Sequence, residues 1–201
     1  MARCNFRVIA AIALVLAVVA FAAPANEDKR AITLDVTPII NALSSLSTAL
    51  SNALSTLNGV QSGAITDASA VVSAVANVVN QILAVGTAVA AALATKLLTA
   101  GQALASDVNT IVSQVNTISG QLQQFASALT SSAVTQLLSL NGLALTTVKG
   151  LVTGGLQTLN GILGSLGTVL GSASSSISSA VSSIASALSN IKITISATAS
   201  G

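Results

Sequence analysis

Eight apolar residues recur at alternating steps of four and three along residues 104–129, and most positions between them are polar and uncharged. They are Leu104, Val108, Ile111, Val115, Ile118, Leu122, Phe125 and Leu129. This is the a/d spacing of a coiled coil, in which one narrow stripe of a helix is apolar. An isolated helix with so narrow a stripe is unstable in water. The stripe, named here the 104–129 seam, must therefore be buried against other segments, another chain or an apolar phase.

Similar spacing in other segments predicts further helices. One begins at Thr37-Pro38, with Thr37 as N-cap, and ends at Asn58-Gly59; a second runs from Thr66-Asp67 to Gly101. Proline suits the first helical position and glycine the left-handed residue at a helix end. The pattern allows the seam helix to continue to Leu140, where Asn141-Gly142 follows. A bend at Gly86 is compatible with the second helix because glycine weakens a helix interior.

Residues 142–171 keep a helical spacing of apolar residues but are interrupted by many glycines. Two interpretations remain open: close helix approach through glycine faces, or a frayed helix. A Leu-Asn-Gly helix-end pattern recurs at Leu54–Val60, Leu137–Leu143 and Leu156–Ile162, and its third copy allows this region to be two helices. A final helix is expected over Ile177–Ile191.

Two short stretches have the alternating pattern of a β-strand. They are Ile32–Thr37 and Ile191–Ser196, which bracket the helical region. The stretches are compatible with a two-stranded ribbon on the helices, with pairing to another molecule, or with disorder. The expected fold class is therefore all-α, an elongated amphipathic helical bundle or coiled-coil-like body, with short β tails at the two ends of the mature chain.

The N-terminus has the features of a secretory signal. Arg3 and Arg7 precede an apolar run, and Ala23-Pro24-Ala25 offers small residues for cleavage. Lys29-Arg30 fits a propeptide processing site and an exposed linker equally well. The expected organisation is a signal peptide at 1–25, a propeptide or linker at 26–30 and one helical domain at 31–201.

Charge is scarce beyond the signal. Residues 31–201 hold three acids and three lysines, so their formal charges cancel: Asp35, Asp67, Asp107, Lys96, Lys149 and Lys192. The acids precede or begin predicted helices and the lysines lie at predicted helix ends, which suits the helix dipole. A neutral chain with 1% aromatic residues lacks the phosphate contacts and stacking platforms of a nucleic-acid binder. We therefore expect no nucleic-acid partner.

Catalytic chemistry has little support in the residues. The chain has no His, no Glu after Glu27 and no Cys after Cys4, which removes the usual general bases and metal ligands. Ser189-Asn190-Ile191-Lys192 matches a Ser-x-x-Lys pattern, but its partner motifs are missing and a Ser-rich chain produces this spacing by chance. We expect no enzyme activity, no catalytic, cofactor-binding or metal-binding residues, and no cofactor.

Membrane insertion is the main alternative to a soluble helical body. Residues 82–100 are interrupted only by Gly86, three threonines and Lys96, and Lys96 lies near one end of the run. Alanine-rich sequence is weakly apolar and a lysine is unfavourable in a bilayer, so a buried helix is favoured.

Composition resembles that of two kinds of secreted protein: Ala/Ser-rich coiled-coil silks, and small helical proteins that coat hydrophobic surfaces. It differs from typical coiled-coil silks in its scarcity of Glu and Lys beside the stripes. We expect a secreted, non-enzymatic structural or surface-active protein that self-associates or coats apolar interfaces, with itself or an apolar surface as partner. The alternative is a membrane-active or lipid-binding helical protein: pore-forming, antimicrobial or a lipid carrier.

Overall fold

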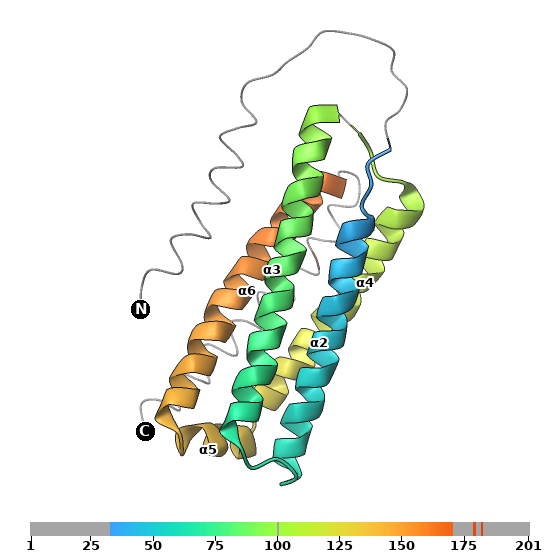
Figure 1. The fold of residues 1–201 in the computed structure, drawn as a ribbon. Coiled ribbons are helices and arrows are strands. Elements are labelled where there is room, and N and C mark those ends of the chain that lie inside the picture. The colour runs from blue at the N-terminus through green and yellow to red at the C-terminus, as the bar shows by residue number, and fades with distance from the viewer. Residues whose placement is uncertain (1–32, 100, 171–178, 180–181, 183–201) are drawn as a thin grey trace.

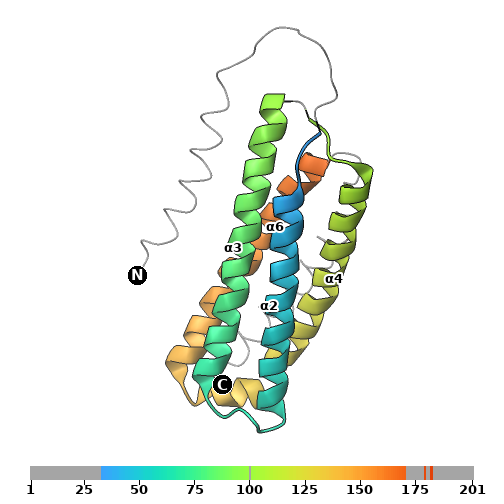
Figure 2. The same ribbon diagram turned by 45° about the vertical axis from the view of Figure 1, so that its right-hand side comes forward.

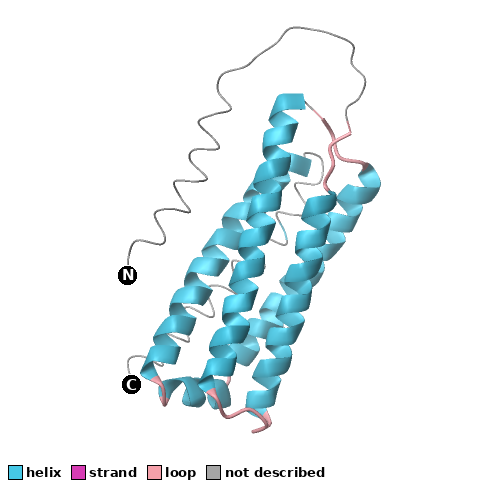
Figure 3. Ribbon diagram, viewed as in Figure 1, coloured by secondary structure: helices cyan, strands magenta, loops and turns pink. Residues whose placement is uncertain are grey.

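The computed structural model describes residues 33–99, 101–170, 179 and 182 (Figure 1). Long helices joined by short connections account for most of this part of the chain: α2 (Thr37–Gln61), α3 (Ala68–Thr99), α4 (Ala105–Leu129), α5 (Ser132–Ser139) and α6 (Gly142–Leu170). Figure 3 shows that the loops among these residues lie at the two ends of the long helices. The predicted all-α class is confirmed for the described residues. The predicted signal peptide and the dibasic site lie outside them, and so does the predicted 177–191 helix apart from residues 179 and 182, which are helical.

The four long helices lie side by side in the order α6, α3, α2, α4 (Figures 1 and 2). α3 packs against both α6 and α2, and α2 packs against α4. α2 and α4 run in one direction along the molecule, and α3 and α6 run in the other. The short helix α5 crosses one end, where it contacts α6, α2 and α4.

The 104–129 seam is buried over most of its length. Six of its eight residues are buried: Ile111, Val115, Ile118, Leu122, Phe125 and Leu129. Val108 is half-buried, whereas Leu104 is 53% exposed. The helix begins at Ala105, so Leu104 is its extended N-cap residue and precedes the helical stripe. The sequence therefore placed the start of the seam too early.

The same spacing forms the buried stripes of the neighbouring helices. α2 buries all of its predicted positions, namely Ile39, Leu43, Leu46, Leu50, Ala53 and Leu57. α3 buries its stripe from Val71 to Val89, but Leu93 is half-buried and Leu97 is exposed. Figure 1 shows that the C-terminal end of α3 extends beyond its neighbours, so the last turns of its stripe have less to pack against.

The predicted end of the first helix at Asn58-Gly59 is wrong. α2 continues to Gln61, and the left-handed residue is Gly63, with φ of 75°. Gly59 has a packing role instead, because a Cβ at this position would lie 2.7 Å from Cδ1 of Ile65. The Ile65 backbone N–H donates to the Gly59 carbonyl at 3.0 Å, which folds the connection back onto the last turn of α2.

Two further predicted boundaries are also wrong. The seam helix does not continue to Leu140, because α4 ends at Leu129 and the separate helix α5 follows. The Asn160-Gly161 pair does not divide the glycine-rich region, since α6 is one helix from Gly142 to Leu170. Only Asn141-Gly142 lies at a boundary, where Asn141 Oδ1 accepts the Ala144 N–H at 3.2 Å and caps the start of α6.

Two glycines bring α3 and α6 close together. A Cβ on Gly155 would lie 2.8 Å from Val79 Cγ2, and a Cβ on Gly86 would lie 2.9 Å from Ile162 Cδ1. Both pairs are 76 residues apart in sequence (155 − 79 and 162 − 86) and one heptad apart along the helices. The two parallel helices therefore interlock in a single register. The glycine-face interpretation is correct at Gly155, whereas a Cβ on Gly150, Gly154, Gly161, Gly164 or Gly167 would meet no heavy atom of the described residues within 4 Å.

A small polar cluster fixes α2 against α4. Gln121 Nε2 donates to Ser51 Oγ at 2.9 Å and to the Ser47 carbonyl at 3.3 Å, while Ser47 Oγ donates to Gln121 Oε1 at 2.9 Å. A polar contact beside an apolar stripe specifies the register of paired helices, because any shift along the axis would break it.

The predicted β tails do not appear as a paired ribbon among the described residues. Thr33 forms an isolated parallel bridge with Gln102, and the Leu34 N–H donates to the Gln102 carbonyl at 2.8 Å. Leu34 and Val36 are fully buried. The first stretch therefore pairs with the α3–α4 connection, and its predicted partner, residues 191–196, lies outside the described residues.

Adjacent glycines of α6 provide a test of the interlocked register. Gly154→Ala adds a methyl group in open space, so the lower backbone entropy of alanine should raise the free energy of unfolding by about 0.5–1 kcal/mol. Gly155→Ala gains the same propensity but drives a methyl group into the stiff, β-branched Val79, at a cost of about 1–3 kcal/mol. Chemical denaturation of the two variants should rank Gly154→Ala above the wild type and Gly155→Ala clearly below Gly154→Ala. Equal stabilities would contradict the close approach.

Candidate functional surfaces

Two of the described acids act as helix caps. Asp35 Oδ1 accepts the Thr37 N–H at 2.9 Å at the start of α2. Asp67 accepts the Ser69 N–H at 2.8 Å and the Ser69 hydroxyl at 2.6 Å at the start of α3. The predicted Thr37 cap is therefore off by one residue, since Val36 is the N-cap and Asp35 supplies the side-chain acceptor. The hydrogen bonds from the Thr37 and Ser69 side chains and backbone amides lower the pKa of Asp35 and Asp67 respectively.

Asp107 and Lys96 also lie where their charge suits a helix dipole. Asp107 is in the first turn of α4 and Lys96 in the last turn of α3, as predicted. Lys96 reaches a second helix as well: its Nζ donates to the Thr168 carbonyl at 2.8 Å and to the Val169 carbonyl at 2.6 Å, both in the last described turn of α6. It therefore joins the ends of α3 and α6.

Lys149 departs from the prediction. It was expected at a helix end, but it lies in the second turn of α6, because that helix begins only at Gly142. Lys192 and the Ser189–Lys192 pattern lie outside the described residues. No three His, Cys, Asp or Glu side chains gather into a group that could hold a metal ion within the part of the chain that the structure describes.

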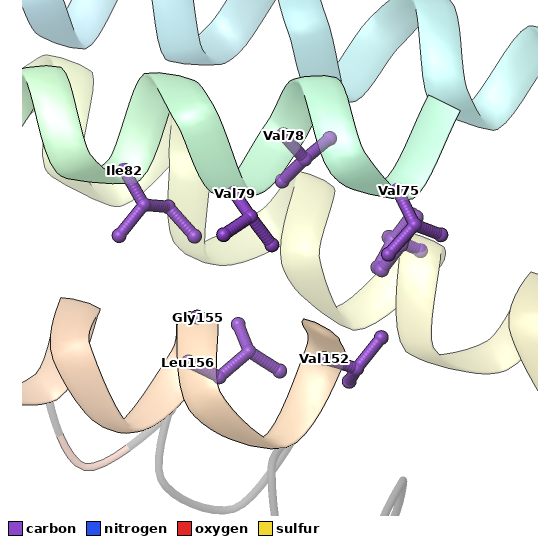
Figure 4. A pocket seen from close by; sticks show the side chains of 8 residues that line it. Val75, Val78, Val79, Ile82, Val152, Gly155 and Leu156 are labelled. Carbon is purple, nitrogen blue, oxygen red and sulfur yellow. The ribbon is translucent and has the colours of Figure 1, made fainter. Parts of the chain in front are cut away.

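A small apolar cavity lies between α3, α6 and α4 (Figure 4). Its lining is entirely apolar: Val75, Val78, Val79, Ile82, Phe125, Val152, Gly155 and Leu156. Its volume is about 10 Å³, the minimum that a single water needs, and it offers no polar partner for that water. The cavity is therefore a packing gap beside the Val79–Gly155 contact and not a ligand site.

Two polar side chains have a buried atom without a hydrogen-bond partner among the described residues, at Gln114 Oε1 and Ser131 Oγ. Gln114 lies seven residues before Gln121 and hence on the same side of α4. The α2 hydroxyls of Ser47 and Ser51 form hydrogen bonds with Gln121, but no described hydroxyl bonds to Gln114 Oε1. A single amide oxygen does not form a binding site.

The outward faces of α2 and α4 are uniformly polar. In α2, every exposed side chain from Asn41 to Asn58 is Ser, Thr or Asn. In α4, every exposed residue from Ser106 to Ser127 is Ser, Thr, Asn or Gln, apart from Gly120. These faces can hydrogen-bond to water at most positions yet carry no charge.

α3 differs from these two helices. Its exposed residues are polar up to Asn80, namely Ser69, Ser73, Asn77 and Asn80. From Leu83 onward they form what is named here the α3 apolar face: Leu83, Ala84, Thr87, Ala91, Thr95, Leu97 and Leu98. Mean hydropathy reaches 1.8 over an 18-residue window of α3, and 22% of that window is buried. By length and composition alone, α3 could cross a membrane, a criterion that core helices of soluble proteins also meet.

Large exposed apolar side chains gather at the two ends of the molecule. Leu97, Leu98 and Leu104 lie at the α3–α4 end, whereas Leu140 and Leu143 lie at the α5–α6 end. The sequence analysis assigned Leu97 and Leu104 to buried stripes, because periodicity does not reveal where neighbouring helices stop. Comparison of the chain with protein-family models, curated proteins and solved structures found no match.

Removing the Lys96 ammonium should loosen the end of the molecule where α3 meets α6. Lys96→Met keeps the aliphatic stem but loses two charge-assisted hydrogen bonds, so the free energy of unfolding should fall by about 1–2 kcal/mol. Lys149→Met is the matched control, because Lys149 has no side-chain hydrogen bond or ion pair to any described residue, and its stability should stay within about 0.5 kcal/mol of wild type. Equal losses in both variants would show that the Lys96 contacts contribute nothing.

Folding stability should be insensitive to pH between about 5 and 7, because the chain has no His and the pKa values of Asp35 and Asp67 are lowered from the ordinary value of 3.8. Asp35 and Asp67 have lowered pKa values in the folded state. A lowered pKa stabilises the fold above the unfolded pKa, and this contribution disappears as the pH falls through the folded value.

Thermal unfolding followed by circular dichroism should therefore give the same Tm at pH 5 and 7 and a lower one at pH 3. The double variant Asp35→Asn, Asp67→Asn should lose much of this acid sensitivity. A Tm that changes between pH 5 and 7 would contradict the assignment.

Proposed function

We propose that this is a secreted, non-enzymatic structural or surface-active protein, with a coiled-coil-like helical body that self-associates or coats apolar interfaces. The observation that supports it is the division of the surface into two kinds. α2 and α4 present uncharged polar faces, whereas the C-terminal half of α3 presents an apolar one. Figure 2 shows α4 on the far side of α2 from α3, so the polar face of α4 and the apolar face of α3 belong to helices that α2 separates. Such a body has a preferred orientation at a boundary between water and an apolar phase.

The absence of net charge suits dense packing. Residues 31–201 carry three acids and three lysines, so their sum is zero. Like-charged molecules repel one another when they crowd at a surface, whereas Ser, Thr, Asn and Gln hydrate a surface without this repulsion. The exposed leucines at both ends add apolar area through which copies can associate.

A non-enzymatic role is consistent with how the described charges are used. Asp35, Asp67 and Lys96 each hold a helix end, and Asp107 lies in a first turn. A general acid or base needs a free group beside a substrate cavity. The cavity beside Val79 contains neither a titratable group nor space for a substrate.

A membrane-active or lipid-binding protein is the second candidate. The observation that favours it is α3 itself, a 32-residue helix with high mean hydropathy and a small buried share. This function predicts that lipid copurifies with the protein or that a dye leaks from vesicles to which it is added.

Surface tension and sedimentation test the principal proposal. The protein secreted from cells that express the full chain should lower the surface tension of water at micromolar concentration, or sediment as an assembly whose mass increases with concentration. Bovine serum albumin at the same mass concentration is a suitable reference for nonspecific adsorption. A strictly monomeric protein without surface activity would rule the proposal out, and dye leakage at the same concentration would favour the second candidate.

A further inference from the structure

The outward stripe of α3 is polar in the first half of the helix and mostly apolar in the second half. Exposed positions recur every three or four residues on this side of α3, first as Ser69, Ser73, Asn77 and Asn80, then as Ala84, Thr87, Ala91, Thr95 and Leu98. Both halves bury an inner stripe in the same core, as far along the helix as Ala92. The difference therefore concerns only the surface that faces away from the protein.

Polar side chains between residues 83 and 98 already have partners within the protein. The Thr87 hydroxyl donates to the Leu83 carbonyl at 3.1 Å, and the Thr95 hydroxyl donates to the Ala91 carbonyl at 3.0 Å. The third polar group is the Lys96 ammonium, which is bound by two α6 carbonyls. This part of α3 therefore loses little hydrogen bonding if water is removed from it.

Some hydroxyls on α2 and α4 are bonded in the same way, such as those of Thr48 and Thr117, but these faces also carry amides. Asn41, Asn52 and Asn58 on α2, and Gln123 and Gln124 on α4, expose groups with two donors and an acceptor. Transfer of these amides out of water is costly. Among the outward faces of α2, α3 and α4, the α3 apolar face is the one that loses least when it leaves water.

The chemistry of this face points to hydrocarbon and not to a protein partner. Protein interfaces are anchored by aromatic side chains and Arg, and they are oriented by hydrogen bonds. The α3 apolar face has none of these anchors and no free donor. None of its residues carries a charge that would attract an anionic or cationic surface, so the surface that suits it best is electrically neutral.

We infer that the α3 apolar face lies against the hydrocarbon of an electrically neutral lipid layer, with the polar faces of α2 and α4 in water. This inference rests on the proposed function and specifies its contact surface. A helix in such a position is held by apolar burial with no electrostatic attraction to headgroups. Binding is therefore independent of salt and gains nothing from anionic lipid.

Single glutamates on α3 and on the polar faces of α2 and α4 test the inference. Ala84→Glu and Ala91→Glu place a charge on the α3 apolar face, and Ser55→Glu on α2 and Ser113→Glu on α4 are matched controls at exposed helical positions. Glutamate is a good helix former, and circular dichroism verifies that all four variants fold. Cosedimentation with vesicles of phosphatidylcholine measures binding of the full chain as secreted.

The expected result is that the wild type and both controls bind alike, while each α3 variant binds about tenfold more weakly. Wild-type binding should not change between about 0.05 and about 1 M NaCl, nor when part of the lipid is phosphatidylserine. Equal binding by all four variants overturns the inference, and so does binding that falls with salt.

Other outcomes separate this inference from the proposed function. A wild type that lowers surface tension and self-associates but does not bind the vesicles overturns the lipid contact and leaves the proposed function standing. Loss of self-association in the α3 variants, without any vesicle binding by the wild type, assigns the face to a second copy and also overturns the inference. If the wild-type protein is inactive in every assay, both the lipid contact and the proposed function are wrong.

Discussion

Burial of one narrow aliphatic stripe per helix is the interaction on which the rest of this structure depends. Among the described residues, Phe125 is the single aromatic side chain, so the interior has to be filled by Val, Leu, Ile and Ala. Short side chains fill space only if the helices come close together. Gly155 and Gly86 permit this between α3 and α6, where a methyl group would collide with Val79 or Ile162. Phe125 of α4 lines the gap that remains beside them.

The few polar contacts between helices set register where the aliphatic stripes do not. A stripe of similar residues can shift by one heptad with little loss of burial. Gln121 between Ser47 and Ser51 opposes such a shift of α4 on α2. Lys96 has the same effect on α3 and α6, because its reach to Thr168 and Val169 is satisfied in only one alignment. These polar contacts therefore restrict how α2 aligns with α4 and how α3 aligns with α6.

The small number of charged residues also shapes the surface. Asp35 and Asp67 are used at helix starts and Lys96 at a helix end, which leaves Ser, Thr, Asn and Gln to hydrate α2 and α4. Beyond Asn80 the outer face of α3 keeps only Thr87 and Thr95 of these residue types. The molecule is thus amphipathic on two scales: each helix has an apolar inner stripe, and the assembled body has one apolar side. The second scale is the physical basis of the interfacial role proposed above.

Periodicity alone determined the all-α class, the buried positions of α2 and the seam from Ile111 to Leu129, because helix geometry repeats locally along the chain. It also located Asp67 and Asp107 at helix starts, since capping involves residues close in sequence. Only the tertiary structure decided that α2 continues past Gly59, where Ile65 folds back. The tertiary structure was also needed to show that α6 continues past Gly161 and that Leu97 and Leu104 are exposed. The two-sided surface likewise depends on which faces the neighbouring helices cover. Those outcomes depend on contacts between residues distant in sequence, such as Val79 with Gly155 and Lys96 with Thr168, which no local pattern encodes.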